Sequence, residues 1–100
     1  MEPDKQHVWI TTRRLEPGTR EEFSRAWRPT RFPEGMLHAF EYWADDRDEV
    51  VGVSVWESPE ALDRYRLSEV EKERRRAMAP YVVEEHSGFY VGRELKIPRT

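Results

Sequence analysis

The chain has 100 residues, a formal net charge of -3 and no cysteine, so it holds neither a disulfide framework nor a thiolate site. We expect one domain over residues 1–100, beginning with a polar tail at 1–6 that lacks the apolar core of a signal peptide. Acidic and basic residues are interspersed and no apolar run could span a bilayer, which predicts a cytoplasmic protein that binds neither nucleic acid nor membrane.

The first predicted element is a strand over 7–15, a segment rich in β-branched and aromatic residues. Alternate residues fall on its two faces: Val8, Ile10 and Thr12 on one, Trp9, Thr11 and Arg13 on the other. We expect Arg13 at the surface or in a salt bridge of a dimer. After a turn at 16–18, Thr19 and Glu22 predict a capping box for a helix that extends to about Trp27.

A second period of alternation begins after Gly35 and predicts a second strand over 36–43. One face carries Met36, His38, Phe40 and Tyr42, and the other carries Leu37, Ala39, Glu41 and Trp43. The polar turn at 45–48 indicates an antiparallel hairpin with a third strand over 50–56. That third strand is apolar on both faces, which is typical of a central strand.

Trp56 ends the third strand directly before a well-marked helix start. Ser58 can accept from free amides, Pro59 has its φ preset for a first turn, and Glu60 suits the positive end of the helix dipole. The helix should reach about residue 67. Ser68 and Glu71 then predict a second capping box and a new helix over 69–79, whose charged block we interpret as a solvated surface.

The last predicted element is an extended C-terminal strand region over 81–97, with a bend or bulge near Gly88. The order of elements is that of a ferredoxin-like β-α-β-β-α-β fold: α+β, with a four-stranded antiparallel sheet and helices on one face. Because the strands carry apolar residues on both faces, two helices cannot cover them. We therefore predict a homodimer through the open sheet face, a dimeric α+β barrel that the C-terminal strand helps to close.

A short motif supports this architecture. The run Trp56-Glu57-Ser58 followed by Glu60-Ala61 resembles the W-E-S-x-E-A signature of the antibiotic biosynthesis monooxygenase family, and the element order extends the resemblance over nearly the whole chain. The resemblance implies dimeric α+β barrels with a pocket between sheet and helices. It also implies monooxygenase activity without cofactors on a phenolic, quinol or polyketide-type molecule, because a deprotonated, electron-rich ring can reduce dioxygen itself.

A site of this kind needs an aromatic wall, a base that titrates near neutral pH, and polar groups that hold negative charge. The catalytic candidates are His38 and Trp56, and the candidates for binding a small aromatic or hydrophobic substrate are Thr11, Tyr65 and His86. Each also has a plain structural reading, as a packing, interface or bend residue. No cofactor is expected, and no metal, because the three histidines lack the spacing of a ligand pair.

One branch of the family degrades haem, using an asparagine on the first strand, the signature tryptophan and a histidine in the second helical region. The chain contains no asparagine, and no histidine lies between Trp56 and Pro80, so we do not expect haem degradation. The sequence leaves open whether the protein is an enzyme. The alternatives are a non-catalytic dimer that binds a small hydrophobic ligand and a purely structural dimerisation module.

Overall fold

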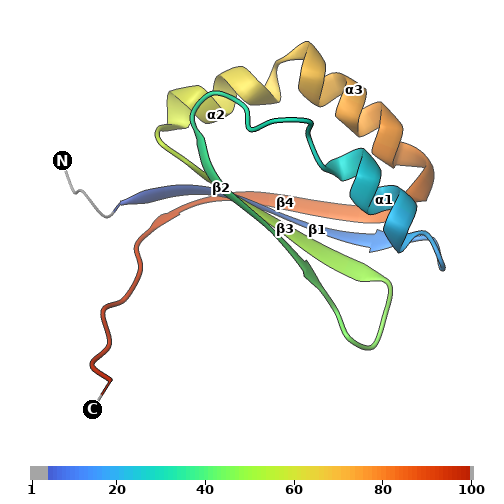
Figure 1. The fold of residues 1–100 in the computed structure, drawn as a ribbon, viewed down its shortest axis with the longest axis horizontal. Helices are drawn as coiled ribbons and strands as arrows, with labels where there is room; N and C mark the ends of the chain where they lie inside the picture. The colour runs from blue at the N-terminus through green and yellow to red at the C-terminus, as the bar shows by residue number, and fades with distance from the viewer. Residues whose placement is uncertain (1–4, 100) are drawn as a thin grey trace.

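Four segments form one antiparallel sheet in the computed structural model, which describes residues 5–99 (Figure 1). The strands are β1 (Gln6–Leu15), β2 (Met36–Trp43), β3 (Glu49–Trp56) and β4 (Val82–Gly92), and the helices are α1 (Arg20–Trp27), α2 (Pro59–Arg66), α3 (Glu69–Met78) and the short 3-10 helix η1 (Ala79–Tyr81). The predicted ferredoxin-like order is confirmed, with the second helical region divided in two. Residues 1–4 of the predicted polar tail lie outside the described part.

The strand order in the sheet is β2-β3-β1-β4, which makes β3 and β1 the central strands. The helices all lie on one side of the sheet (Figure 1). On β1 this side carries Trp9, Thr11 and Arg13, which share one face as the alternation along the strand predicts, and all three are buried. In the described part of the chain, no helix is both long enough and apolar enough to cross a membrane.

The pairing of β2 with β3 contains an irregularity that the sequence did not reveal. Met36 pairs with Trp56 and His38 pairs with Val55, so Leu37 is an extra residue in β2. Because side chains alternate along a strand, one extra residue moves Met36 to the helix-covered face while His38 stays on the open face. The prediction that Met36 and His38 share a face was therefore wrong.

The expected bulge near Gly88 was also wrong. The pairing of β4 with β1 is regular from Gln6 opposite Gly92 to Arg14 opposite Glu84, and the register shifts only beyond Arg14. Gly88 instead makes room for a ring, since a Cβ there would lie 2.5 Å from the hydroxyl oxygen of Tyr90. The strand ends at residue 92, so residues 93–97 of the predicted strand region are not part of the sheet.

Two of the three predicted helix caps are formed. Ser58 accepts a hydrogen bond from the Ala61 amide at 3.1 Å, and Ser68 accepts one from the Glu71 amide at 3.2 Å. The capping box predicted at Ser68 is only half formed, because the Ser68 amide donates to the Tyr65 carbonyl oxygen and the Glu71 carboxylate faces Arg74 and Arg75. The capping box predicted at Thr19 was wrong. The Thr19 hydroxyl donates to the Glu16 carbonyl oxygen in the preceding turn at 2.7 Å, and it accepts no hydrogen bond from an amide of the first helical turn.

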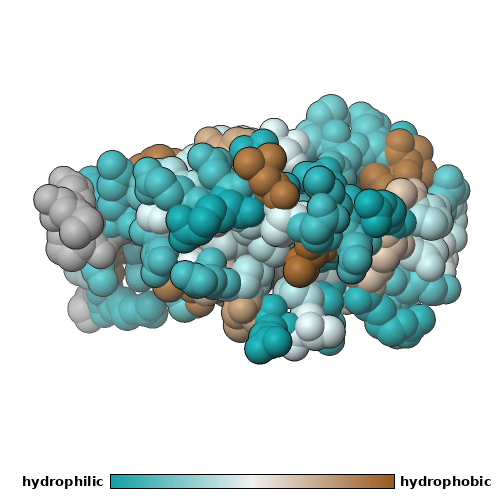
Figure 2. Space-filling model, turned by 90° about the horizontal axis from the view of Figure 1, so that it is seen from above, coloured by the Kyte–Doolittle hydropathy of each residue, from teal (hydrophilic) through white to brown (hydrophobic). Residues whose placement is uncertain are grey.

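The two sides of the molecule differ in character. The side that carries the helices is mostly hydrophilic, with isolated hydrophobic residues (Figure 2). On the opposite side of the sheet, Phe40, Tyr42 and Tyr90 are between 42% and 56% exposed, and the rings of Phe40 and Tyr42 stack with centroids 5.9 Å apart. The sheet thus has an uncovered aromatic face, as the patterning of the strands predicts.

Candidate functional site

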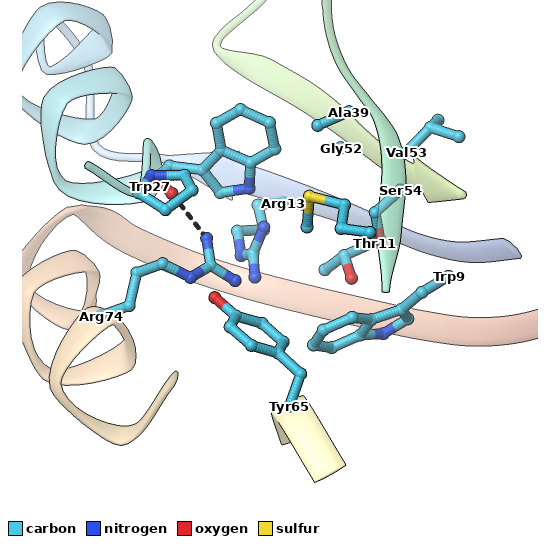
Figure 3. A pocket seen from close by; sticks show the side chains of 12 residues that line it. Trp9, Thr11, Arg13, Trp27, Ala39, Gly52, Val53, Ser54, Tyr65 and Arg74 are labelled. Atoms are coloured by element: carbon cyan, nitrogen blue, oxygen red, sulfur yellow. Dashed lines mark hydrogen bonds between the residues drawn. The ribbon is translucent and has the colours of Figure 1, made fainter. Parts of the chain in front are cut away.

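A small cavity lies between the helix-covered face of the sheet and the helices (Figure 3). Strands β1 and β3 line one side, Trp27 of α1 and Met36 of β2 line another, and Tyr65 of α2 and Arg74 of α3 close it. Its volume is about 40 Å³. That space holds roughly three water molecules, so an aromatic ring enters it only if the side chains that line it move apart.

The cavity has aromatic walls because of a glycine on β3. A Cβ at Gly52 would lie 3.2 Å from the indole of Trp27, so the absence of a side chain there lets Trp27 approach the sheet. Trp9 forms another wall and stacks on Phe89 of β4 with ring centroids 5.9 Å apart. Two indoles therefore contribute to the lining of the cavity, and aromatic lining residues suit a ligand that carries a ring.

Arg13 brings a positive charge into this space. The residue is 1% exposed, its Nε donates to Glu85 Oε1 at 2.8 Å, and its guanidinium carbon lies 5.6 Å from the centre of the Phe23 ring. Burial lowers the pKa of Arg13, although arginine keeps its charge at any physiological pH. The expectation of a surface or dimer position for Arg13 was wrong, because Arg13 shares a strand face with Trp9 and Glu85 of the same chain compensates its charge.

Helix α3 contributes the second buried ion pair. Glu71 is fully buried, and Arg74 Nε donates to Glu71 Oε1 at 2.8 Å while Arg74 Nη1 donates to the Trp27 carbonyl oxygen at 2.7 Å. Arg75 Nε lies 3.1 Å from Glu71 Oε2, close enough for an ion pair although the geometry is not that of a hydrogen bond. The reading of the block 69–76 as a solvated surface was therefore wrong for Glu71 and Arg74. Residues 71, 74, 75 and 78 recur at helical spacing and form the face of α3 turned toward the sheet.

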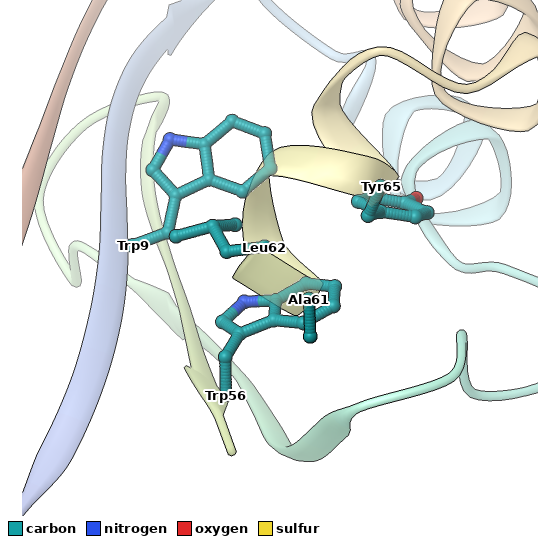
Figure 4. Packing of buried hydrophobic residues seen from close by; sticks show 5 residues of the cluster. All are labelled: Trp9, Trp56, Ala61, Leu62 and Tyr65. Carbon is teal, nitrogen blue, oxygen red and sulfur yellow. The ribbon is translucent and has the colours of Figure 1, made fainter. Parts of the chain in front are cut away.

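Tyr65 stands between the cavity and the core. It is buried, and its ring lies 5.3 Å from the ring of Trp56, in a cluster that also contains Trp9, Ala61 and Leu62 (Figure 4). Burial raises the pKa of Tyr65, which keeps its hydroxyl protonated and able to donate a hydrogen bond. That hydroxyl points toward the guanidinium of Arg74 (Figure 3).

The structure brings two of the five predicted site residues into the cavity. Thr11 and Tyr65 both line it, and the Thr11 hydroxyl lies 2.8 Å from that of Ser87. Trp56 is 1% exposed and packs behind Tyr65 rather than lining the cavity; its Nε1 donates to Ser54 Oγ at 2.8 Å.

The two predicted histidines lie on the open face of the sheet. His38 stacks on Phe40 of β2 with ring centroids 6.1 Å apart, and the Nε2 of His86 lies 3.0 Å from Glu84 Oε2 on β4. Both therefore lie across the sheet from the cavity. Among residues 5–99, no group of three His, Asp or Glu side chains is placed to hold a metal ion.

Sequence reasoning missed Arg13, Trp27 and Arg74 as cavity residues. A signal existed for Arg13, because it alternates with Trp9 and Thr11 on the face that the helices cover. For Arg74 the signal was its spacing of three residues after Glu71 and four before Met78 on one helix face. Trp27 carried no signal, since its position over Gly52 depends on how α1 packs against the sheet.

The chain has the ferredoxin-like α+β fold of solved structures that are named as antibiotic biosynthesis monooxygenases. A structure from Chloroflexus aurantiacus that carries this family name provisionally is 20% identical, covers 89% of this chain and 96% of its own, and superimposes with a TM-score of 0.72. Similarly named structures from Nitrosomonas europaea and Bacillus cereus are 16% and 19% identical, with TM-scores of 0.75 and 0.69. They cover 92% and 93% of this chain, and 94% and 98% of their own.

The resemblance read from the W-E-S-x-E-A run is therefore confirmed at the level of the fold. No family model matches the sequence, and no curated protein matches it either.

Proposed function

We propose that the chain is a monooxygenase that needs no cofactor and acts on a small phenolic, quinol or polyketide-type molecule. The observation that carries the proposal is the cavity, in which two indole walls flank a space bounded by the hydroxyls of Thr11 and Tyr65 and by two guanidiniums. Such a space can bind an electron-rich ring and exclude water from it. The cysteine-free sequence suits a reducing compartment, and we place the activity in the cytoplasm.

The chemistry proposed for an anthrone-like substrate needs no external reductant. The ionised ring transfers electrons to dioxygen, one oxygen atom joins the ring carbon, and a ring CH₂ becomes a ketone. The second oxygen atom leaves as water with the two hydrogens of that CH₂ group. The protein binds the ring, favours its ionised form and supplies hydrogen-bond donors to developing negative charge.

Oxygen uptake tests this function. With a panel of aerated quinols and anthrone-like compounds, wild type should consume oxygen faster than buffer, and Tyr65→Phe should lose about tenfold or more because a donor to the substrate oxygen is removed. The catalytic role predicted for His38 is tested in the same assay. Since its imidazole lies across the sheet from the cavity, we expect His38→Ala to retain wild-type uptake.

Two outcomes would contradict this assignment. A wild-type rate no faster than buffer across the panel would remove the oxygenase proposal. A loss in His38→Ala as large as that in Tyr65→Phe would make His38 the base and place the reaction on the other face of the sheet.

A non-catalytic binding protein is the second candidate, and the small volume of the cavity favours it. A space of about 40 Å³ leaves little room for both a ring and dioxygen. Ligands that raise the melting temperature without any oxygen uptake would support this candidate over the first.

We also propose that two copies of the chain associate through the uncovered aromatic face. Phe40, Tyr42 and Tyr90 project from it, and residues 93–99 run away from the body of the subunit (Figure 1), with Leu95 66% exposed and Ile97 73% exposed. One set of helices covers one face of the sheet only. A second copy would bury the other face and offer an apolar surface for this tail.

Light scattering after size exclusion should therefore give about twice the chain mass of 12.0 kDa for wild type. The double variant F40E/Y42E should elute as a monomer, because like charges from both copies would be buried in the interface without partners. Leu67→Glu is the matched control, since Leu67 is 78% exposed at the end of α2 on the helix side, and it should remain a dimer. A wild-type protein that is monomeric at micromolar concentration would refute the assembly.

A further inference from the structure

The ionic network beside the cavity contains one more positive than negative charge. Its guanidiniums are those of Arg13, Arg74 and Arg75, and its carboxylates are those of Glu71 and Glu85. Arg13 and Arg74 have side chains that are only 2% and 11% exposed, so solvent screens their mutual repulsion weakly. An anion placed between them would complete the charge balance.

Arg13 also has donors without acceptors. Its Nε is bonded to Glu85, but within residues 5–99 neither terminal nitrogen of its guanidinium makes a hydrogen bond. The side chain lines the cavity, and its terminal nitrogens share one space with the guanidinium of Arg74 and the hydroxyl of Tyr65 (Figure 3). A guanidinium fork whose terminal nitrogens reach a cavity matches an anionic oxygen well.

We propose that the cavity binds its ligand as an oxyanion, a single-ring phenolate whose oxygen is held by Arg13 and Arg74 with Tyr65 as a third donor. The ring would lie between the indoles of Trp9 and Trp27. Naming the ligand a phenolate rests on the proposed function, whereas the preference for an anion rests on the charges and donors alone.

This arrangement has a consequence for how the substrate ionises. When the phenol binds, its O–H bond breaks, the electron pair stays on oxygen and the proton leaves to solvent. The two guanidiniums favour the ionised form, by roughly 1–3 pH units for opposite charges in contact. The cavity therefore activates the substrate without a protein base, which fits the position of both His38 and His86 on the other face of the sheet.

The probe for this inference is 4-nitrophenol, whose neutral and ionised forms absorb at different wavelengths. Its ring is too electron-poor to reduce dioxygen, so binding is observed without turnover. We expect the bound dye to ionise roughly 1–3 pH units below the free dye. The neutral methyl ether 4-nitroanisole, of similar shape, should bind about tenfold more weakly or worse. A bound dye that ionises at or above the pH of the free dye, or equal binding of the ether, would overturn the inference.

Two variants on one helix sharpen the test. Arg74→Met keeps the length of the side chain and removes its charge, so it should abolish most of the pH shift and weaken dye binding about tenfold. Arg76→Met is the control, because Arg76 is exposed on α3, and it should behave as wild type. Equal behaviour of the two variants would overturn the inference. If Arg74→Met does not fold, the binding of 4-nitrophenol and 4-nitroanisole to the wild-type protein is sufficient to test the anion site.

The outcome is separable from that of the oxygen-uptake assay. Binding of the ionised dye by a protein that oxidises no quinol would uphold the anion site and remove the oxygenase proposal. Oxidation of quinols by a protein that binds the neutral dye would uphold the oxygenase proposal and remove the anion site.

Discussion

Replacement of Glu71 by alanine is expected to lower the free energy of unfolding by about 3–5 kcal/mol, one of the two largest effects of a single substitution that we predict for this protein. The Glu71 carboxylate is fully buried and touches the guanidiniums of both Arg74 and Arg75. Without it, Arg74 and the nearby Arg13 would repel each other in a poorly hydrated space. The cost comes mainly from the charge left uncompensated, since a buried ion pair adds little net stability by itself.

Urea denaturation followed by circular dichroism measures this effect. Glu73→Ala on the same helix is the control, because Glu73 is exposed, and it should change stability by about 0.5 kcal/mol or less. The double variant E71A/R74M should regain part of the loss, since it removes one of the stranded charges together with its partner. If Glu71→Ala costs no more than Glu73→Ala, the network is hydrated, and the surplus of positive charge in the cavity loses its importance.

Substitution of Trp56 by alanine should cost a similar amount, about 3–5 kcal/mol. The indole is 1% exposed and packs in the cluster with Trp9, Ala61, Leu62 and Tyr65 (Figure 4), so its removal would leave a void where several side chains meet. Its hydrogen bond to the hydroxyl of Ser54 would be lost as well. Leu67→Ala is the control, because that side chain is 78% exposed and supports no core contact.

The milder variant Trp56→Phe separates packing from catalysis. It keeps an aromatic ring behind Tyr65, so we expect a smaller loss of stability, near 1–2 kcal/mol, and a substrate KM that rises more than kcat falls. This pattern would show that Trp56 positions Tyr65. A fall in kcat of about a hundredfold with unchanged stability would instead give Trp56 the catalytic role that the sequence motif predicts.

Local sequence patterns were sufficient to predict most of the fold, because each pattern depends on a few neighbouring residues. The alternation along 7–15 separates the covered face of Trp9 and Thr11 from the open face, since a strand has a period of two. Ser58 and Ser68 mark helix starts because each hydroxyl bonds an amide only three residues away. The W-E-S-x-E-A run then led to the same fold that the structural neighbours have.

The candidate site was predicted only in part, because it joins side chains from six elements. Thr11 was found because it shares a strand face with Trp9, and Tyr65 because it lies on the helix that follows Trp56. His38 was proposed for its chemistry, but its side depends on the extra residue at Leu37, which is decided by how β2 pairs with β3. No short sequence pattern predicts an extra residue of this kind in the pairing of two strands.

The sequence by itself determined the order of elements, the hairpin, two helix caps and the surplus of apolar strand surface, because each follows from the spacing of neighbouring side chains. Only the tertiary structure decided which charges are buried. Arg13 and Glu71 look like surface residues in the sequence. Arg13 is buried because Glu85, 72 positions away along the chain, supplies an opposite charge at close range, and Glu71 is buried because Arg74 and Arg75 do so from three and four residues further along the helix. The electrostatics of the cavity is thus a property of helix packing on the sheet rather than of any one segment.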